Sequence, residues 1–347
     1  MTDFWVGSYT ASMGGQARGI GWAQTRDDGT LEYRGVAAEA SSPSFLAHGH
    51  PNSVGAGILY AVDEAAARIE AYRVVAPGML EPLGGQATSG AAPCHISVTQ
   101  DHLYVANYVG GTADRFTLNV DGSVGELVDT LRGTGSGPHA AQEGPHLHST
   151  LPVGESVLSA DLGSDLVREQ RLVGGQRDPA EATFAIDETI RPDSPSLMLV
   201  AETEFPPATG PRDLLLTDGE IFALGELSGA LFRLNEHGAI LASGRSVADW
   251  APGDHAAALA AYGDWLYTGL RGSNRIAVAH RGDLAPAFSL PTGGDWPRHL
   301  IVAGETLHVA NQLSSTVTSF RLDRTTGIPT PVGAPAAVPS PTYLLPA

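Results

Sequence analysis

The segment Leu103-Tyr-Val-Ala-Asn-Tyr108 indicates the fold of this protein, because close variants of it recur along the whole chain. Each copy is a short apolar run that ends in polar residues, which is typical of a buried β-strand. A period of about 40 to 50 residues between such copies indicates a repeat architecture. The other copies are Phe4-Trp-Val-Gly-Ser-Tyr9, Leu59-Tyr-Ala-Val-Asp-Glu64, Val157-Leu-Ser-Ala-Asp-Leu162, Ile221-Phe-Ala-Leu-Gly-Glu226, Leu266-Tyr-Thr-Gly-Leu-Arg271 and Leu307-His-Val-Ala-Asn-Gln312.

Further strands flank each copy. A short apolar strand precedes it, often opened by a proline, as in Pro93-Cys-His-Ile and Pro297-Arg-His-Leu. An alternating strand follows it, as in Arg68-Ile-Glu-Ala-Tyr-Arg73, and a variable fourth strand closes the unit. Four-stranded units repeated without helical periodicity predict an all-β, seven-bladed β-propeller with antiparallel blades, in which radial closure protects the sheet edges. A β-sandwich or two smaller β domains is the alternative.

The two ends of the chain complement each other. The segment after Pro341 supplies only a first strand, whereas residues 4–42 supply a second, third and fourth. We therefore expect one domain over residues 1–347, with its last blade built from both termini. Residues 174–195 form a polar insertion that we expect to be a surface loop. The predicted blades span about 43–92, 93–144, 145–210, 211–254, 255–296, 297–340, and 341–347 together with 1–42.

Composition excludes several classes of protein. The formal net charge is −18 and all 20 basic residues are arginine, so neither nucleic acid nor an anionic membrane is an expected partner. The lack of lysine excludes Schiff-base chemistry and a Walker-type phosphate site. Cys94 is the single cysteine, which excludes an internal disulfide and a cysteine zinc cluster. No basic signal region or long apolar run is present, so we expect a soluble cytoplasmic protein, a monomer or a weak homo-oligomer.

The repeat register brings two sets of residues to one mouth of the central channel. An innermost strand starts at the edge where its antiparallel neighbour ends, so both sets should surround the same opening. Nine positions before the repeated strand stand Cys94, His148, Arg212, Ala257 and Arg298. At its end stand Tyr9, Glu64, Tyr108, Leu162, Glu226, Arg271 and Gln312, preceded by Ser8, Asp63, Asn107, Asp161, Gly225, Leu270 and Asn311.

Arginines dominate the charged residues of this predicted mouth. Arg212, Arg271 and Arg298 in one depression fit an anionic ligand, because guanidinium forks bind carboxylate or phosphate. His148 and Glu226 are the acid-base candidates beside them. Two alternatives stay open: a channel of polar groups that bond to each other and to water, or a metal held by His146 and His148.

Motifs in separate repeats resemble, in order and over essentially the whole chain, those of the seven-bladed propeller lactonases. This family includes the bacterial propeller-type 6-phosphogluconolactonase and, as a relative, the fungal carboxymuconate-lactonising enzyme. The resemblance implies an active site of His148, Arg212, Glu226 and Arg271. The motifs are Gly7-Ser-Tyr-Thr10, Pro145-His-Leu-His-Ser149, Asp161-Leu-Gly-Ser-Asp165, Gly210-Pro-Arg212, Glu226-Leu227, Arg271-Gly272, Trp296-Pro-Arg298 and Val309-Ala-Asn-Gln312.

The same resemblance implies hydrolysis of a small anionic sugar lactone without metal or cofactor, with 6-phosphogluconolactone as the leading substrate of the pentose phosphate route. Glu226 or His148 would activate water, and which arginine takes which task is not evident from sequence. Asp213 and Ala258 stand where the family often has His and Glu. Another lactonase, a cycloisomerase or a non-catalytic binding propeller stay as alternatives. The residues expected to bind substrate are Arg298, His146, Glu64, Tyr108, Asn107 and Gln312.

Overall fold

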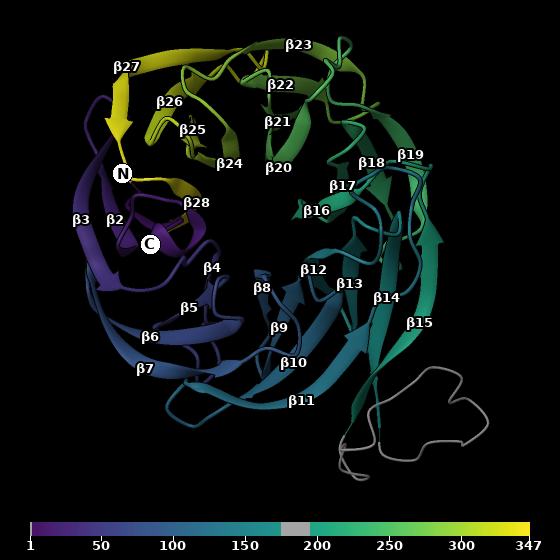
Figure 1. The fold of residues 1–347 in the computed structure, drawn as a ribbon. Helices are drawn as coiled ribbons and strands as arrows, with labels where there is room; N and C mark the ends of the chain where they lie inside the picture. The colour runs from purple at the N-terminus through teal and green to yellow at the C-terminus, as the bar shows by residue number, and fades with distance from the viewer. Residues whose placement is uncertain (1, 175–194) are drawn as a thin grey trace.

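A computed structural model describes residues 2–174 and 195–347 of the chain. These residues form seven four-stranded antiparallel sheets arranged radially around a central axis (Figure 1). The predicted seven-bladed β-propeller is therefore confirmed. The insertion predicted at 174–195 lies, except for its first and last residue, outside the described residues.

Each sheet runs from an innermost strand at the axis to an outermost strand at the rim. The innermost strands are β4 (Leu46–His48), β8 (Pro93–Val98), β12 (Leu147–Val153), β16 (Pro211–Thr217), β20 (His255–Tyr262), β24 (Pro297–Ala303) and β28 (Pro341–Pro346). The second strands are β5 (Ile58–Asp63), β9 (His102–Asn107), β13 (Ser156–Asp161), β17 (Glu220–Gly225), β21 (Trp265–Arg271), β25 (Thr306–Asn311) and β1 (Phe4–Ser8).

The two outer positions complete the blades. The third strands are β6 (Arg68–Ala76), β10 (Thr112–Leu118), β14 (Leu166–Val173), β18 (Ala230–Leu234), β22 (Arg275–His280), β26 (Thr316–Leu322) and β2 (Gly19–Thr25). The outermost strands are β7 (Met79–Ala87), β11 (Val124–Arg132), β15 (Ser196–Glu204), β19 (Ile240–Arg245), β23 (Pro286–Pro291), β27 (Pro329–Ala337) and β3 (Leu31–Glu39). A single turn of 3₁₀-helix, η1 (Ala11–Met13), links β1 to β2.

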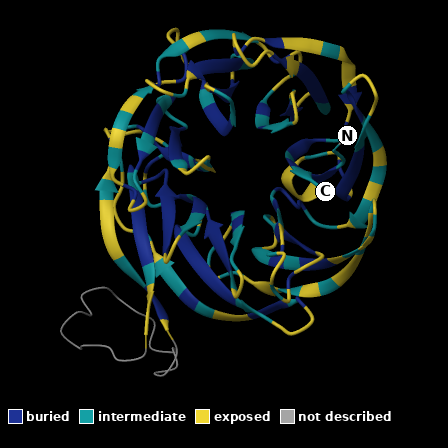
Figure 2. Cartoon of the chain, turned by 180° about the vertical axis from the view of Figure 1, so that it is seen from behind, coloured by how far each residue is buried: buried dark blue, intermediate teal, exposed yellow. Residues whose placement is uncertain are grey.

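Burial follows the radial order (Figure 2). The second strands are buried along most of their length, whereas the outermost strands alternate between exposed and half-buried residues. A strand covered on both faces needs apolar residues throughout, which explains the near-continuous apolar runs of the repeat. Neighbouring blades share their cores: Phe222 of β17 packs in one cluster with Leu259 and Leu266 of the next blade.

The ring closes where the termini meet, as predicted. β28 pairs with β1 in antiparallel register, with Val6 opposite Leu344. The backbone N–H of Ala347 donates to the Asp3 carbonyl at 2.8 Å. Every sheet therefore has neighbours on both faces, and closure buries surface that an open array would leave exposed.

Most second strands begin and end one residue earlier than the sequence predicts. In most repeats, though not in the one where Arg271 is the last residue of β21, the residue that closes the repeated stretch therefore lies just beyond its strand. Its backbone N–H bonds to the segment that leads into an innermost strand, as when Glu226 donates to the Gly210 carbonyl at 2.8 Å and Tyr108 to the Ala92 carbonyl at 2.9 Å. These bonds hold the turn in place and leave the side chain free to face the axis.

Candidate active site

The innermost strands carry β-bulges that aim side chains at the axis. In β12 the pairing passes from Leu147 to Ser149, so His148 has no partner on β13. Arg212 is skipped in the same way between Pro211 and Asp213. A bulged residue leaves the ladder and its side chain takes a new direction. Bulges at the same height of the channel expose Cys94, His148, Arg212, Ala258 and Arg298, all of which line one cavity.

In the fifth blade, which consists of β20 to β23, one predicted position is wrong. Counting back from the repeated strand placed Ala257 in the ring, but Ala257 pairs with Gly269 and is fully buried. The bulge falls one residue later, at Ala258, whose φ of 57° shows the local change of direction. Ala258 therefore lines the cavity in place of Ala257.

The cavity on the axis has a volume of about 340 Å³, which is enough for a small sugar lactone. His148, Arg212 and Arg298 stand in its wall, and Asp213 and His299 lie next to them along the innermost strands. Residues of β16, including Leu214 to Leu216, also line it. The wall thus combines charged groups with strand residues of an apolar type.

Glu226 binds two of the arginines. Arg212 Nε donates to Glu226 Oε2 at 2.6 Å, and Arg271 Nη2 lies 2.7 Å from the same oxygen. The second contact is an ion pair without hydrogen-bond geometry, because Arg271 Nη2 has no hydrogen-bond partner in the described parts of the chain. His255 Nδ1 lies 3.6 Å from Glu226 Oε1. The carboxylate thus holds two cations together.

The charges of this cluster shift its pKa values. Burial raises the pKa of Glu226, but Arg271, His255 and Arg212 outweigh it and hold that pKa well below its usual range. Burial lowers the pKa of Arg271 to about 10, against the raising effect of Glu226. At neutral pH the cluster therefore contains an ionised carboxylate and two guanidinium cations.

His148 is neutral under the same conditions. Burial and then Arg212 lower the pKa of its imidazole well below the usual value, with only Glu226 opposing them. Its ring meets the edge of Tyr108 with 5.8 Å between ring centroids, and its ring nitrogens make no hydrogen bond to any described residue. A neutral imidazole with an unused nitrogen is a proton acceptor.

A second carboxylate occupies the same mouth. Tyr9 Oη donates to Glu64 Oε1 at 3.0 Å, and Ser44 Oγ donates to Glu64 Oε2 at 2.5 Å. Arg298 Cζ lies 4.7 Å from the centroid of the Tyr9 ring, a cation–π contact. Tyr9, Glu64, Ser44 and Arg298 are called the Glu64 cluster below, and Glu226, Arg212, Arg271 and His255 the Glu226 cluster.

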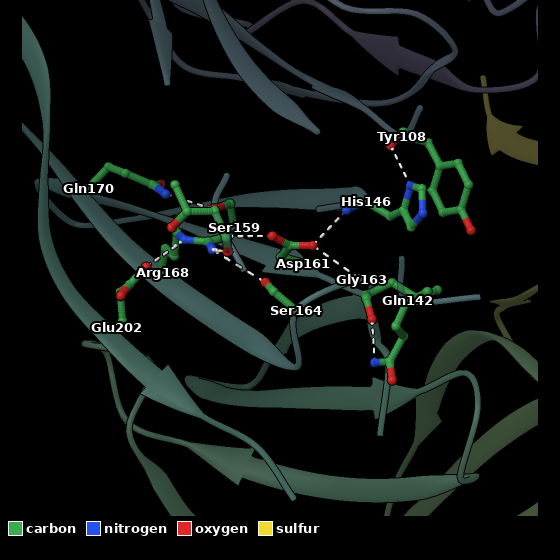
Figure 3. A network of polar contacts seen from close by, with 12 residues as sticks. Tyr108, Gln142, His146, Ser159, Asp161, Gly163, Ser164, Arg168, Gln170 and Glu202 are labelled. Carbon is green, nitrogen blue, oxygen red and sulfur yellow. Dashed lines mark hydrogen bonds and ion pairs between the residues drawn. The ribbon is translucent and has the colours of Figure 1, made fainter. Parts of the chain in front are cut away.

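The remaining predicted residues are Tyr108 and His146, whose rings stack, and Asn107 and Gln312, which carry side-chain amides. The rings of Tyr108 and His146 stack with 4.6 Å between their centroids, and His146 Nδ1 lies 3.0 Å from the Tyr108 carbonyl oxygen (Figure 3). The Tyr108 ring also meets that of His148, as described above. Asn107 is fully buried and its amide donates to Thr112 and Asp114, so the structure places it inside its blade, away from the Glu226 cluster. The side-chain oxygen of Gln312 is buried with no hydrogen-bond partner among the described residues.

Two contacts of the site were not predicted. His255 faces Glu226, and Trp296 stacks on Arg271, whose Cζ lies 5.6 Å from the ring centroid. His255 opens β20, in the repeat without an opening proline, and Trp296 directly precedes Pro297 of β24, as His146 directly precedes β12. Aligning the starts of the repeats could have indicated both positions.

His146 and His148 do not form the start of a metal centre. His146 is engaged with Tyr108 and lies 3.4 Å from Glu143, whereas His148 faces the cavity. Within residues 2–174 and 195–347, no three His, Cys, Asp or Glu side chains gather as metal ligands. That the reaction needs no metal or cofactor stays a prediction.

Together these features define a seven-bladed β-propeller whose axial cavity carries a charged acid-base site. The chain matches the family described as Lactonase, 7-bladed beta-propeller, over residues 3–346, and it belongs to this family. Among the described helices, none is long and apolar enough to cross a membrane.

Individual relatives agree with this assignment. The chain is similar to the 6-phosphogluconolactonase of Bacillus subtilis, with 27% identity across 97% of this chain and 96% of the relative. It superposes on the crystal structure of a protein from Lactobacillus plantarum with a TM-score of 0.85 and 26% identity, covering 100% and 99% of the two chains. A periplasmic gluconolactonase of Pseudomonas aeruginosa shares the fold, with a TM-score of 0.81 and 24% identity over 99% and 98%.

Proposed function

We propose that this chain hydrolyses 6-phosphogluconolactone to 6-phosphogluconate. Membership of the lactonase family and the full-length similarity to the Bacillus subtilis enzyme support a lactone hydrolase. The observation that carries the proposal is the neutral His148 in one cavity with Arg212 and close to the Glu226 cluster. This arrangement combines a proton acceptor with cations that stabilise developing negative charge.

In the proposed reaction His148 is the general base. The oxygen of a water molecule attacks the ring carbonyl carbon while His148 takes a proton from that water. Glu226 is less suited to this step, because its oxygens already face Arg212, Arg271 and His255 and its pKa is held low. The imidazolium then returns its proton to the ring oxygen as the carbon–oxygen bond of the lactone breaks.

The arginines stabilise the intermediate. Attack on the carbonyl places a negative charge on its oxygen, and Arg212, which lines the cavity, offers guanidinium donors to that charge. Removing one such donor from an oxyanion site costs on the order of 10² to 10³ in kcat. Glu226 acts as a positioning residue, since it holds both guanidinium groups in place and offsets part of their mutual repulsion.

The test is hydrolysis of freshly generated 6-phosphogluconolactone, with spontaneous ring opening subtracted and a chelator present. His148→Gln is expected to lower kcat by roughly 10² to 10⁴, the range of general base catalysis. His280→Gln is the matched control, because His280 is exposed on β22 and does not line the cavity. Wild-type activity in His148→Gln would refute the assigned base, and loss of activity with chelator would refute the metal-free reaction.

Location and partners form part of the same proposal. Hydrolysis of this substrate would place the chain in the pentose phosphate route of the cytoplasm, as a monomer or weak homo-oligomer without nucleic acid or membrane partners. The acidic net charge of −18 supports the absence of polyanionic partners. Cell fractionation and size-exclusion chromatography test the location and the oligomeric state.

A further inference from the structure

The three arginines of the mouth differ in what occupies their N–H donors. Arg212 and Arg271 both face Glu226 Oε2, at 2.6 and 2.7 Å. Arg298, by contrast, has neither a hydrogen bond nor an ion pair with any residue in the described ranges, although it lines the cavity as Arg212 does. A guanidinium group carries five donors and stays charged at any physiological pH. Arg298 therefore presents an uncommitted cation to the cavity.

The surroundings of Arg298 fix its plane without using its donors. Its guanidinium lies over the face of the Tyr9 ring, with 4.7 Å from Cζ to the ring centroid. Glu64 does not neutralise it by direct contact, because the Glu64 oxygens accept hydrogen bonds from the hydroxyls of Tyr9 and Ser44. Stacking on an aromatic ring orients the planar group and leaves its edge free for a bidentate ligand.

The pairing of charges around the cavity also favours an anion at Arg298. Arg212 and Arg271 both face Glu226, and Asp213 adds a further carboxyl group to the cavity wall. Arg298 is the arginine of this set that makes no ion pair with a described residue, in a chain whose formal net charge is −18. A cation without a carboxylate in direct contact is suited to a small anion.

We propose that Arg298, seated on Tyr9, is the receptor for the phosphate group of a phosphorylated lactone. This inference rests on the proposed function and assigns different roles to the three arginines. Arg212 and Arg271, held by Glu226, serve the reacting carbonyl, while Arg298 selects substrates that carry a second anionic end. The β-bulge at Arg298 directs its side chain into the cavity, where it can contact the second anionic end of the substrate.

The experiment compares two substrates, 6-phosphogluconolactone and unphosphorylated glucono-δ-lactone, in the wild type and in Arg298→Gln. The ratio of their kcat/KM values is expected to fall about ten- to a hundredfold in the variant, mainly through KM for the phosphorylated lactone, because charge-assisted hydrogen bonds to phosphate are lost. Arg324→Gln is the matched control, since Arg324 also lies over a tyrosine ring, that of Tyr262, but is exposed and outside the cavity. An equal loss on both substrates would overturn the inference and assign Arg298 to the chemical step.

Binding of inorganic phosphate keeps the test independent of turnover. Titration calorimetry should show that Arg298→Gln weakens phosphate binding about tenfold or more, whereas Arg324→Gln does not. Equal phosphate affinity in wild type and Arg298→Gln would contradict the inference. If the wild type hydrolyses neither lactone but binds phosphate through Arg298, the proposed function fails and the anion site stands. Arg298→Lys, which keeps the charge and loses the fork, should bind with intermediate affinity and controls for misfolding.

Discussion

Asp161 and Glu226 are both carboxylates paired with arginine, but Asp161 is sealed inside a blade, whereas Glu226 is partly exposed and binds Arg212, which lines the axial cavity. Asp161 is fully buried and binds Arg168 Nη1 at 2.6 Å, and its other oxygen accepts the backbone N–H groups of His146 and Gly163 (Figure 3). Arg168 also donates to Glu202 and to the Thr134 carbonyl. All of these donors and acceptors are matched, so the network has no capacity left for a ligand.

The Glu226 cluster is built from the same residue types with the opposite outcome. Its carboxylate shares one oxygen between Arg212 and Arg271, and Arg271 Nη2 has no hydrogen-bond partner among the described residues. Arg212 lines the cavity, whereas Arg168 uses its donors inside its own blade. Similar pairs of arginine and carboxylate therefore hold a blade together or serve a ligand according to whether the arginine reaches the cavity.

Removing the sealed pair should have the largest effect on stability. Asp161→Asn leaves Arg168 buried beside a neutral amide, and breaking a buried pair costs about 3 to 5 kcal/mol of the free energy of unfolding. Chemical denaturation measures this loss. The kcat of the fraction that folds should stay within a few-fold of wild type. If the variant were as stable as wild type, the network would not support the blade as described.

Removing the Glu226 carboxylate should affect catalysis instead. Glu226→Gln frees Arg212 and Arg271 from their common partner, and kcat/KM should fall by about 10² to 10³, the effect of losing one preorganised electrostatic group. The free energy of unfolding should fall less than in Asp161→Asn, because Arg212 lines the cavity, where water can solvate it. Glu236→Gln, on an exposed side chain, is the matched control. The contrast would break down if this variant lost stability and kept its turnover.

Lowering the pH should distinguish a histidine sealed inside a blade from the histidine of the cavity. We expect this effect to be smaller than those of the two substitutions. Burial lowers the pKa of His308 to about 4, and burial followed by Arg212 lowers that of His148 well below its usual value. The unfolded chain therefore binds more protons than the folded one below the usual histidine pKa. Stability is complete above about pH 6.5 and falls with acid toward pH 4, at roughly 1.4 kcal/mol per pH unit for one imidazole.

A variant assigns this pH dependence. His308→Gln should flatten the slope of stability between pH 6.5 and 4 without moving the acid limb of kcat/KM, since His308 is sealed against Ser319 and Phe4. The acid limb itself should lie well below pH 6.5, where neutral His148 becomes protonated. Denaturation midpoints and initial rates across this range provide the measurement. An activity limb at pH 6.5 would contradict the burial of His148.

The fold followed from the sequence because a blade is a local pattern repeated seven times. The convergence of His148 with Arg212 also followed, since equivalent positions in a closed ring face one axis. Asn107 did not, because a polar residue at the end of a strand can face the axis or the blade interior, and only packing decides between them. The sequence also could not assign the arginine partners, which depend on the directions of side chains beyond the strand ends.

The bulged positions of the innermost strands β8, β12, β16, β20 and β24 separate catalysis from architecture. Because a bulged residue pairs with nothing on the second strand, exchanging its side chain leaves the hydrogen-bonded ladder intact. The ring thus has equivalent positions at which evolution can substitute one functional group at a time. Two of these positions, Cys94 and Ala258, hold small side chains and line the cavity together with His148, Arg212 and Arg298. They are the natural places at which a designer would add a group to change the substrate of this scaffold.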